Sequence, residues 1–218
     1  MRRVLAAISL LVLLPWTTAA LAVVTVDFTV LANNSVDITT VSNPAGLTLN
    51  GITFTYDDLG SGVDTASVNA SGVYGSMGGS LTFAFSAPVT QVNFDFSLLG
   101  VFAPVSDGLS ITFKNGGNDV TDQVVPANTF TPYYPNDPTL GGDASGRLAY
   151  SGAAFDQATM FFSLDAPFFS VANLSYDNVP EVVLPPLPGQ CGIGVVETML
   201  MSLSGLMFLR FGRRYDVF

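Results

Sequence analysis

Apolar and polar residues alternate along most of this chain, and the clearest case is residues 81–99. In two runs, 81–86 and 91–98, every second residue is apolar. Successive side chains of a strand point to opposite faces, so each run places an apolar row against a core and a polar row toward solvent. Ala87 and Pro88 separate the runs. We therefore predict two adjacent antiparallel strands joined by a turn at these residues.

The same alternation recurs on both sides of this pair. It appears at 24–30, at 47–56 with a break at Asn50 and Gly51, and at 109–113, 120–125, 158–164 and 168–176, with a short possible strand near 66–74. The Gly-rich run 115–118 predicts a hairpin turn. Residues 57–80 and 126–146 are predicted to be loop-dominated. No segment of the body has a helical period, so residues 23–178 are predicted to form an all-β, antiparallel β-sandwich, jelly-roll-like, of nine or ten strands.

The two ends of the chain have a different composition from the body. Residues 1–22 have two arginines, an apolar run and small residues before Ala22, which is typical of a secretory signal peptide with its short helix. Residues 179–191 form a Pro-rich spacer. Residues 192–218 hold an apolar run that ends at Leu209, followed by arginines, and this pattern predicts a C-terminal membrane helix. The alternative is an amphipathic or buried helix of the domain.

The C-terminal segment resembles the tail of the bacterial PEP-CTERM sorting-signal proteins. Glu197 corresponds to the glutamate of the Pro-Glu-Pro motif, and Arg210, Arg213 and Arg214 correspond to the terminal arginine cluster. The motif is degenerate because neither neighbour of Glu197 is a proline. The resemblance implies export to the cell envelope, cell surface or extracellular space, and processing by an exosortase-like enzyme. A retained membrane anchor is the alternative for the same tail.

Composition narrows the chemistry that the body can perform. Residues 23–180 contain no His, no Cys and no Glu, and their fourteen Asp against Lys114 and Arg147 give a net charge of −12. Nucleophilic triads and His-ligated zinc are therefore excluded, and nucleic acid is not an expected partner. The one cysteine, Cys191, lies just before the apolar tail, where it is free, paired between molecules or part of a processing site.

Calcium is the cofactor that this composition favours, because hard cations bind carboxylate and amide oxygens. If the first and last strands meet, Asp27, Asp177 and Asn178 are the candidate ligands, and Asp57, Asp58 and Asp64 form a second cluster. The alternative is that these aspartates form turns and add solubilising charge.

The loop after residue 126 contains three aromatic residues, Phe130, Tyr133 and Tyr134, among several prolines. Aromatic faces stack on sugar rings, so these residues are candidate sugar-binding residues, and exopolysaccharide is a candidate partner. The alternative is that the loop folds over the core with its aromatic side chains buried.

Three functions are compatible with these features. The first is a non-enzymatic surface or extracellular-matrix protein, and the second is an envelope-attached carbohydrate-binding module. The third is a secreted glycosidase or lyase, which requires two Asp side chains in one cleft. The sequence favours the first and names no catalytic residue.

Overall fold

A computed structural model describes residues 22–32 and 34–178 of the 218-residue chain, and this part is all-β. Its strands form one sheet in which every pairing between strands is antiparallel. The strands are β1 (Ala22–Thr25), β2 (Val36–Asp37), β3 (Leu47–Leu49), β4 (Ile52–Asp57), β5 (Ala66–Asn69), β6 (Gly72–Ser76), β7 (Ser80–Val101), β8 (Val105–Asn115), β9 (Asn118–Ala127), β10 (Thr129–Pro132), β11 (Gly142–Phe162) and β12 (Phe168–Asn178). Two short 3-10 helices, η1 (Phe28–Leu31) and η2 (Pro138–Leu140), interrupt them.

Two long strands, β7 and β11, organise the sheet, and both change partners midway. The predicted turn at Ala87 and Pro88 is wrong, because β7 runs through both residues as one strand. Its register against β11 shifts between Ser151 and Gln157, opposite this point. A proline has no backbone N–H to donate to a neighbouring strand. It is tolerated at a bulge because the ladder of hydrogen bonds is interrupted there. The chain bends there instead of reversing.

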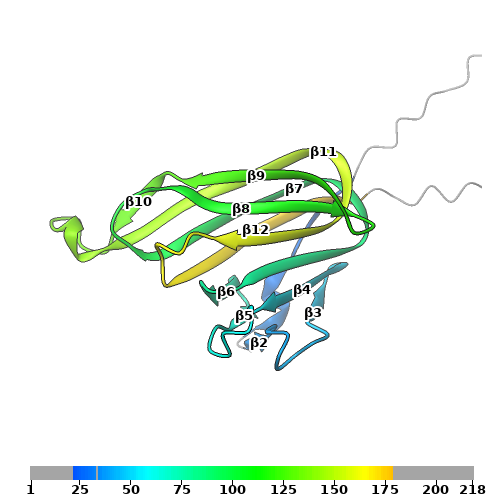
Figure 1. Cartoon of the computed structure of the whole chain (residues 1–218), viewed down its shortest axis with the longest axis horizontal. Helices are drawn as coiled ribbons and strands as arrows, with labels where there is room; N and C mark the ends of the chain where they lie inside the picture. Colours follow the sequence, from blue (N-terminus) through cyan, green and yellow to red (C-terminus); the bar gives the residue numbers. More distant parts are fainter. Residues whose placement is uncertain (1–21, 33, 179–218) are drawn as a thin grey trace, which may run out of the picture. The chain divides into compact units, whose positions relative to one another are not determined.

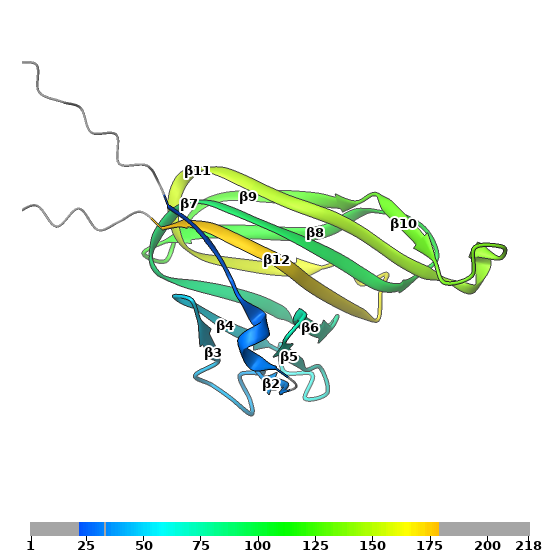
Figure 2. The ribbon, with the colours of Figure 1, turned by 180° about the vertical axis from the view of Figure 1, so that it is seen from behind.

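The bend divides the sheet into two halves that share β7 and β11. The first sheet half contains β3, β4, the start of β7, the end of β11, β8 and β9. The second sheet half contains β2, β5, β6, β12, the end of β7, the start of β11 and β10, with β1 on the end of β12. β8 and β9 lie side by side in Figure 1, and β12, β7 and β11 lie side by side in Figure 2.

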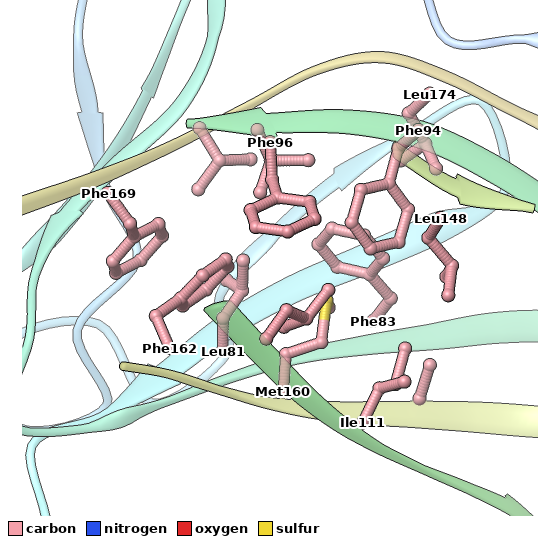
Figure 3. Close-up of a cluster of buried hydrophobic side chains, with 14 of the residues drawn as sticks. Leu81, Phe83, Phe94, Phe96, Ile111, Leu148, Met160, Phe162, Phe169 and Leu174 are labelled. Atoms are coloured by element: carbon pink, nitrogen blue, oxygen red, sulfur yellow. The ribbon is translucent and has the colours of Figure 1, made fainter. Parts of the chain in front are cut away.

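The core lies between the two sheet halves and is rich in phenylalanine. Phe83 at the start of β7 meets Phe94 at its end, with ring centroids 5.9 Å apart. Phe162 of the first half stacks on Phe169 of the second at 4.0 Å. Figure 3 shows these rings in one buried cluster with Met160 among them. The inward rows predicted at 81–85 and 92–98 are therefore correct, and they face each other across one core.

The hairpin predicted at 115–118 is confirmed, and the break noted at Asn50 and Gly51 is a second hairpin turn; both use left-handed residues. β3 and β4 are joined at Asn50 and Gly51, with φ of 47° and 79°, and β8 and β9 are joined at Gly116 and Gly117, with φ of 56° and 82°. Positive φ suits Gly and Asn, which is why these pairs were recognisable.

Three segments differ from the sequence prediction. The strand expected at 24–30 ends at Thr25 and gives way to η1. The segment 57–80 contains the hairpin of β5 and β6, which was not predicted. The connection 126–146 contains β10, which pairs with the start of β11.

The predicted signal peptide up to residue 21, the Pro-rich spacer and the C-terminal tail lie outside the described residues. So do Cys191, Glu197, Arg210, Arg213 and Arg214. Within residues 22–32 and 34–178, no helix has the length and apolar character needed to cross a membrane.

Candidate functional site

A groove of about 490 Å³ opens on the outer face of the second sheet half, and we call it the Tyr74 groove. Its floor comes from β5, β6 and β12, and its edges come from β2 and β7. The residues that line it include Asp37, Ser67, Tyr74, Ser76, Leu99 and Phe168. The groove combines apolar rings with hydroxyls and one carboxylate, as small-ligand sites do.

Two of the three aromatic residues that line the groove are open to solvent, while the third, Phe169, is buried. Tyr74 is 36% exposed and Phe168 is 55% exposed. On the paired strands Tyr74 lies opposite Ser170, and Ser76 lies opposite Phe168. The two rings are therefore diagonal neighbours on one face, about 7–8 Å apart at their backbones. Two rings at this spacing can both contact one short ligand.

Two glycines on β6 let this strand approach β12 closely. A Cβ on Gly72 would stand 2.1 Å from the carbonyl oxygen of Val171, and the φ of Gly72 is 135°. A Cβ on Gly75 would stand 2.6 Å from the ring of Phe169. Both positions exclude larger residues because backbone and ring already occupy the space. Tyr74 lies between these glycines and points away from the core.

Asp37 places a fixed negative charge at one edge of the groove. Its carboxylate accepts hydrogen bonds from the backbone N–H of Thr39, at 2.8 Å, and from the hydroxyl of Ser42. Partial burial acts to raise the pKa of Asp37, but these hydrogen bonds outweigh it and hold the pKa below its ordinary value of 3.8. The group is thus an acceptor at neutral pH and a poor proton donor.

The three aromatic residues proposed from sequence do not form one cluster. Phe130, on β10, is partly buried against the core. Tyr133 and Tyr134 are 52% and 59% exposed, so the alternative of a fully buried aromatic loop is wrong for these two. The Tyr133 hydroxyl donates to Asp143 Oδ1 at 2.7 Å, and this hydrogen bond is the main reason that the pKa of Tyr133 is raised.

The first and last strands meet, as the calcium hypothesis required, but the register separates its two carboxylates. Asp177 lies opposite Val23, four residues from Asp27, or about 13 Å along a strand. The buried Asp177 carboxylate accepts from the N–H groups of Thr90 and Gln91 at 2.8 and 2.7 Å, and Asp27 caps η1.

In the second cluster, the buried carboxylate of Asp58 accepts from the N–H groups of Gly60 and Gly62 at 3.0 and 2.8 Å. Across the described ranges, no three residues of the metal-binding types come together in a group that could hold an ion. Asn178 lies opposite Ala22 in the register.

A second cavity of about 310 Å³ lies beside the β3–β4 turn. Tyr176 lines it, and its hydroxyl donates to the backbone carbonyl of Asn50. Burial raises the pKa of Tyr176. Because Tyr176 and Phe85 are both buried, this cavity presents no open aromatic face.

No protein-family model matches the chain, and no curated protein matches it in sequence. Among solved structures, a family 29 carbohydrate-binding module is similar at 12% identity, with 66% of this chain and 88% of that chain covered and a TM-score of 0.36. The K2 cleaved adhesin domain of Lys-gingipain is similar at 10% identity, with 71% and 97% covered and a TM-score of 0.35. At these TM-scores, the similarities assign neither a fold nor a function to this chain.

Sequence reasoning missed the residues that form the groove. The sequence predicts Tyr74 at the end of a short possible strand in a loop-dominated segment, and it predicts a strand at Phe168 without giving that residue a role. A signal was present in both cases. Val73, Gly75 and Met77 alternate with Tyr74 and Ser76, and of the neighbours Phe168 and Phe169 only one can face inward.

Proposed function

We propose that the described part of the chain is a two-layered β-sandwich that acts as a non-catalytic carbohydrate-binding module. The saccharide binds in the Tyr74 groove. The observation that carries this proposal is the pair of open rings, Tyr74 and Phe168, on a concave face with hydroxyls around them.

The chemistry of a sugar ring fits this surface. Its C–H face is apolar and packs on aromatic rings, while its hydroxyls need donors and acceptors at the rim. Ser67 and Ser76 can serve as both donor and acceptor, and Asp37 accepts strongly because it is ionised.

The groove favours binding over hydrolysis. Glycosidases use two carboxyl groups about 5–10 Å apart, one of them with a raised pKa. Asp37 is the one carboxylate among the residues that line the groove, and its pKa is lowered. Asp143 lies on β11, five strands from β2 in the sheet order, which is about 24 Å. The two carboxylates therefore cannot act on one glycosidic bond.

The ends of the chain belong to the same proposal. Residues 1–22 would export the module, and residues 192–218 would anchor it or have it processed by an exosortase-like enzyme. A sugar-binding body at the envelope would hold exopolysaccharide at the cell surface. In this role the protein would be both a carbohydrate-binding module and a component of the extracellular matrix.

Affinity electrophoresis of the full-length chain through gels containing neutral polysaccharides tests this function. Tyr74→Ala and Phe168→Ala should each weaken binding about five- to tenfold, because each removes roughly 1 kcal/mol or more of ring contact. Phe161→Ala is the matched control, because Phe161 is an exposed ring on the first sheet half, 43% accessible. Equal retardation of all four proteins, or no retardation of any, would contradict the proposal.

A further inference from the structure

Two rows of paired residues extend from the Tyr74 groove across the second sheet half. The first row runs through directly opposed residues from β2 to β10: Asp37, Ser67, Tyr74, Ser170, Ser97, Ser145 and Thr129. All of its members except the end carboxylate carry a hydroxyl. We call it the hydroxyl row.

The second row lies two residues further along the same strands. Ser76, Phe168, Leu99 and Asp143 oppose one another in turn. Asp143 then accepts the hydrogen bond of the Tyr133 hydroxyl. This row therefore carries one exposed ring, Phe168, near its start and leads to another, Tyr133, which lies beyond β11. Asp143 lies two strands, about 10 Å, from Phe168.

The geometry of these rows suits an elongated ligand that lies across the strands. From β2 to β11 the rows span about 24 Å, which is longer than a disaccharide. Open rings lie on β6 and β12 and again beyond β11, and serine hydroxyls on β12, β7 and β11 lie between them. Ser97, Ser145 and Ser170 are half-buried, so their hydroxyls are partly open to a ligand on this face.

Charge decides which polysaccharides this face accepts. The rows carry carboxylates at both ends, Asp37 and Asp143. The described residues hold two cations, and each is paired: Lys114 with Asp119 on the first sheet half at 3.6 Å, and Arg147 with Asp95 at 3.8 Å. An anionic polysaccharide would meet a carboxylate at each end of the rows, and the cation on this face, Arg147, two residues from Ser145, lies beside the carboxylate of Asp95.

We propose that the ligand is a neutral polysaccharide whose chain crosses the strands from Asp37 at β2 to Tyr133 beyond β11. This inference rests on the proposed carbohydrate-binding function. Tyr133 is a second aromatic contact, reached only by a chain of several sugars, and Asp143 positions its ring.

Isothermal titration of the full-length chain with neutral oligosaccharides of two to six sugars, from the series that the gels identify, tests the proposal. The affinity should rise with length. Tyr133→Ala should weaken binding of the hexasaccharide about fivefold and leave the disaccharide unchanged, because only the longer ligand reaches Tyr133. Tyr134→Ala, in the same loop and equally exposed, is the matched control. Polygalacturonate should bind more weakly than a neutral polymer.

The failures of the two proposals are distinguishable. Affinities that do not change with length, a hexasaccharide unaffected by Tyr133→Ala, or preferred binding of polygalacturonate would overturn this inference while leaving the Tyr74 groove a sugar site. The absence of binding to any saccharide would overturn the proposed function and this inference with it. Tyr133→Phe, which keeps the ring and loses the hydrogen bond to Asp143, should retain more hexasaccharide affinity than Tyr133→Ala.

Discussion

The outer faces of the two sheet halves are both rich in hydroxyls, and only one is a credible binding site. On the first half, four threonines oppose one another in turn: Thr55, Thr82, Thr159 and Thr112. The hydroxyls of Thr82 and Thr159 are 3.3 Å apart. This threonine row matches the hydroxyl row of the second half in regularity and in partial exposure.

The two faces differ in their aromatic residues and in their shape. The Tyr74 groove has two open rings on neighbouring strands and a hollow between them. Neither cavity described above is lined by a residue of the threonine row. Outward threonines are ordinary on a half-buried strand because the branched side chain suits the pleat. A row of hydroxyls is thus a property of the sheet, while paired rings in a hollow indicate a ligand.

The largest expected effect comes from adding a side chain at the glycine where β6 approaches β12 most closely. Gly72→Ala sets a Cβ against the Val171 carbonyl at a φ of 135°, so it should lower the free energy of unfolding by about 2–4 kcal/mol and abolish sugar binding. Gly116→Ala is the control, because its Cβ meets nothing within 4 Å, and its φ of 56° costs about 1 kcal/mol. Urea denaturation measures both. An equal loss of unfolding free energy in the two variants would contradict the prediction, because the close approach of β6 to β12 would then add no cost of its own.

A smaller effect is expected from pH, and it should be confined to the groove face. The pKa of Asp37 is lowered, so the carboxylate stays ionised until the pH falls below its ordinary value of 3.8. The hydrogen bonds from Ser42 and Thr39 therefore stabilise the fold at higher pH and are lost as the pH falls through the lowered pKa. Sugar affinity should therefore be constant from pH 7 to 5 and decline only below pH 3.8.

The matched variants for this pH effect are Asp37→Asn and Asp122→Asn, the latter opposite Thr112 at the end of the threonine row. Asp37→Asn should bind sugar more weakly at pH 7, and Asp122→Asn should bind as the unaltered chain does. Titrations at three pH values separate them. A decline in affinity already at pH 6, or the same behaviour in both variants, would count against Asp37 as the rim acceptor.

The smallest expected effect is that of metal removal. Because the Asp177 and Asp58 carboxylates are already satisfied by backbone N–H groups, chelation with EDTA should leave the melting temperature and the sugar affinity unchanged. Differential scanning calorimetry with and without added calcium makes the comparison. A fall of several degrees on chelation would contradict this expectation and support the calcium hypothesis for either cluster.

The sequence predicted well which side chains of each strand face the core, and it predicted poorly which strands lie next to one another. Period-two alternation identified Phe83, Phe94 and Phe96 as core residues, since burial of one face leaves a local pattern. Gly116 and Gly117 located the β8–β9 hairpin for a similarly local reason, while Asn50 and Gly51 marked only a break, which is the β3–β4 turn. The bend at Pro88 was misread as a turn because a proline between two strand patterns favours either outcome.

The groove could not be predicted because it depends on long-range pairing. Tyr74 and Phe168 are 94 residues apart and become neighbours only through the register of β6 on β12. Alternation shows that each points outward and does not show what each lies beside. The loop tyrosines were noticed because they are adjacent in sequence, and one of them, Tyr133, is brought to the end of the same face by its bond to Asp143.

The most direct test of the central claim is hydrogen–deuterium exchange of the full-length chain with and without a saturating neutral hexasaccharide. We predict slower exchange in peptides that contain β6 and residues 168–171 of β12, and unchanged exchange in peptides that contain Thr159 or Thr112. Protection of the threonine row with no change at β6 would contradict the account, because the sugar would then bind the other face.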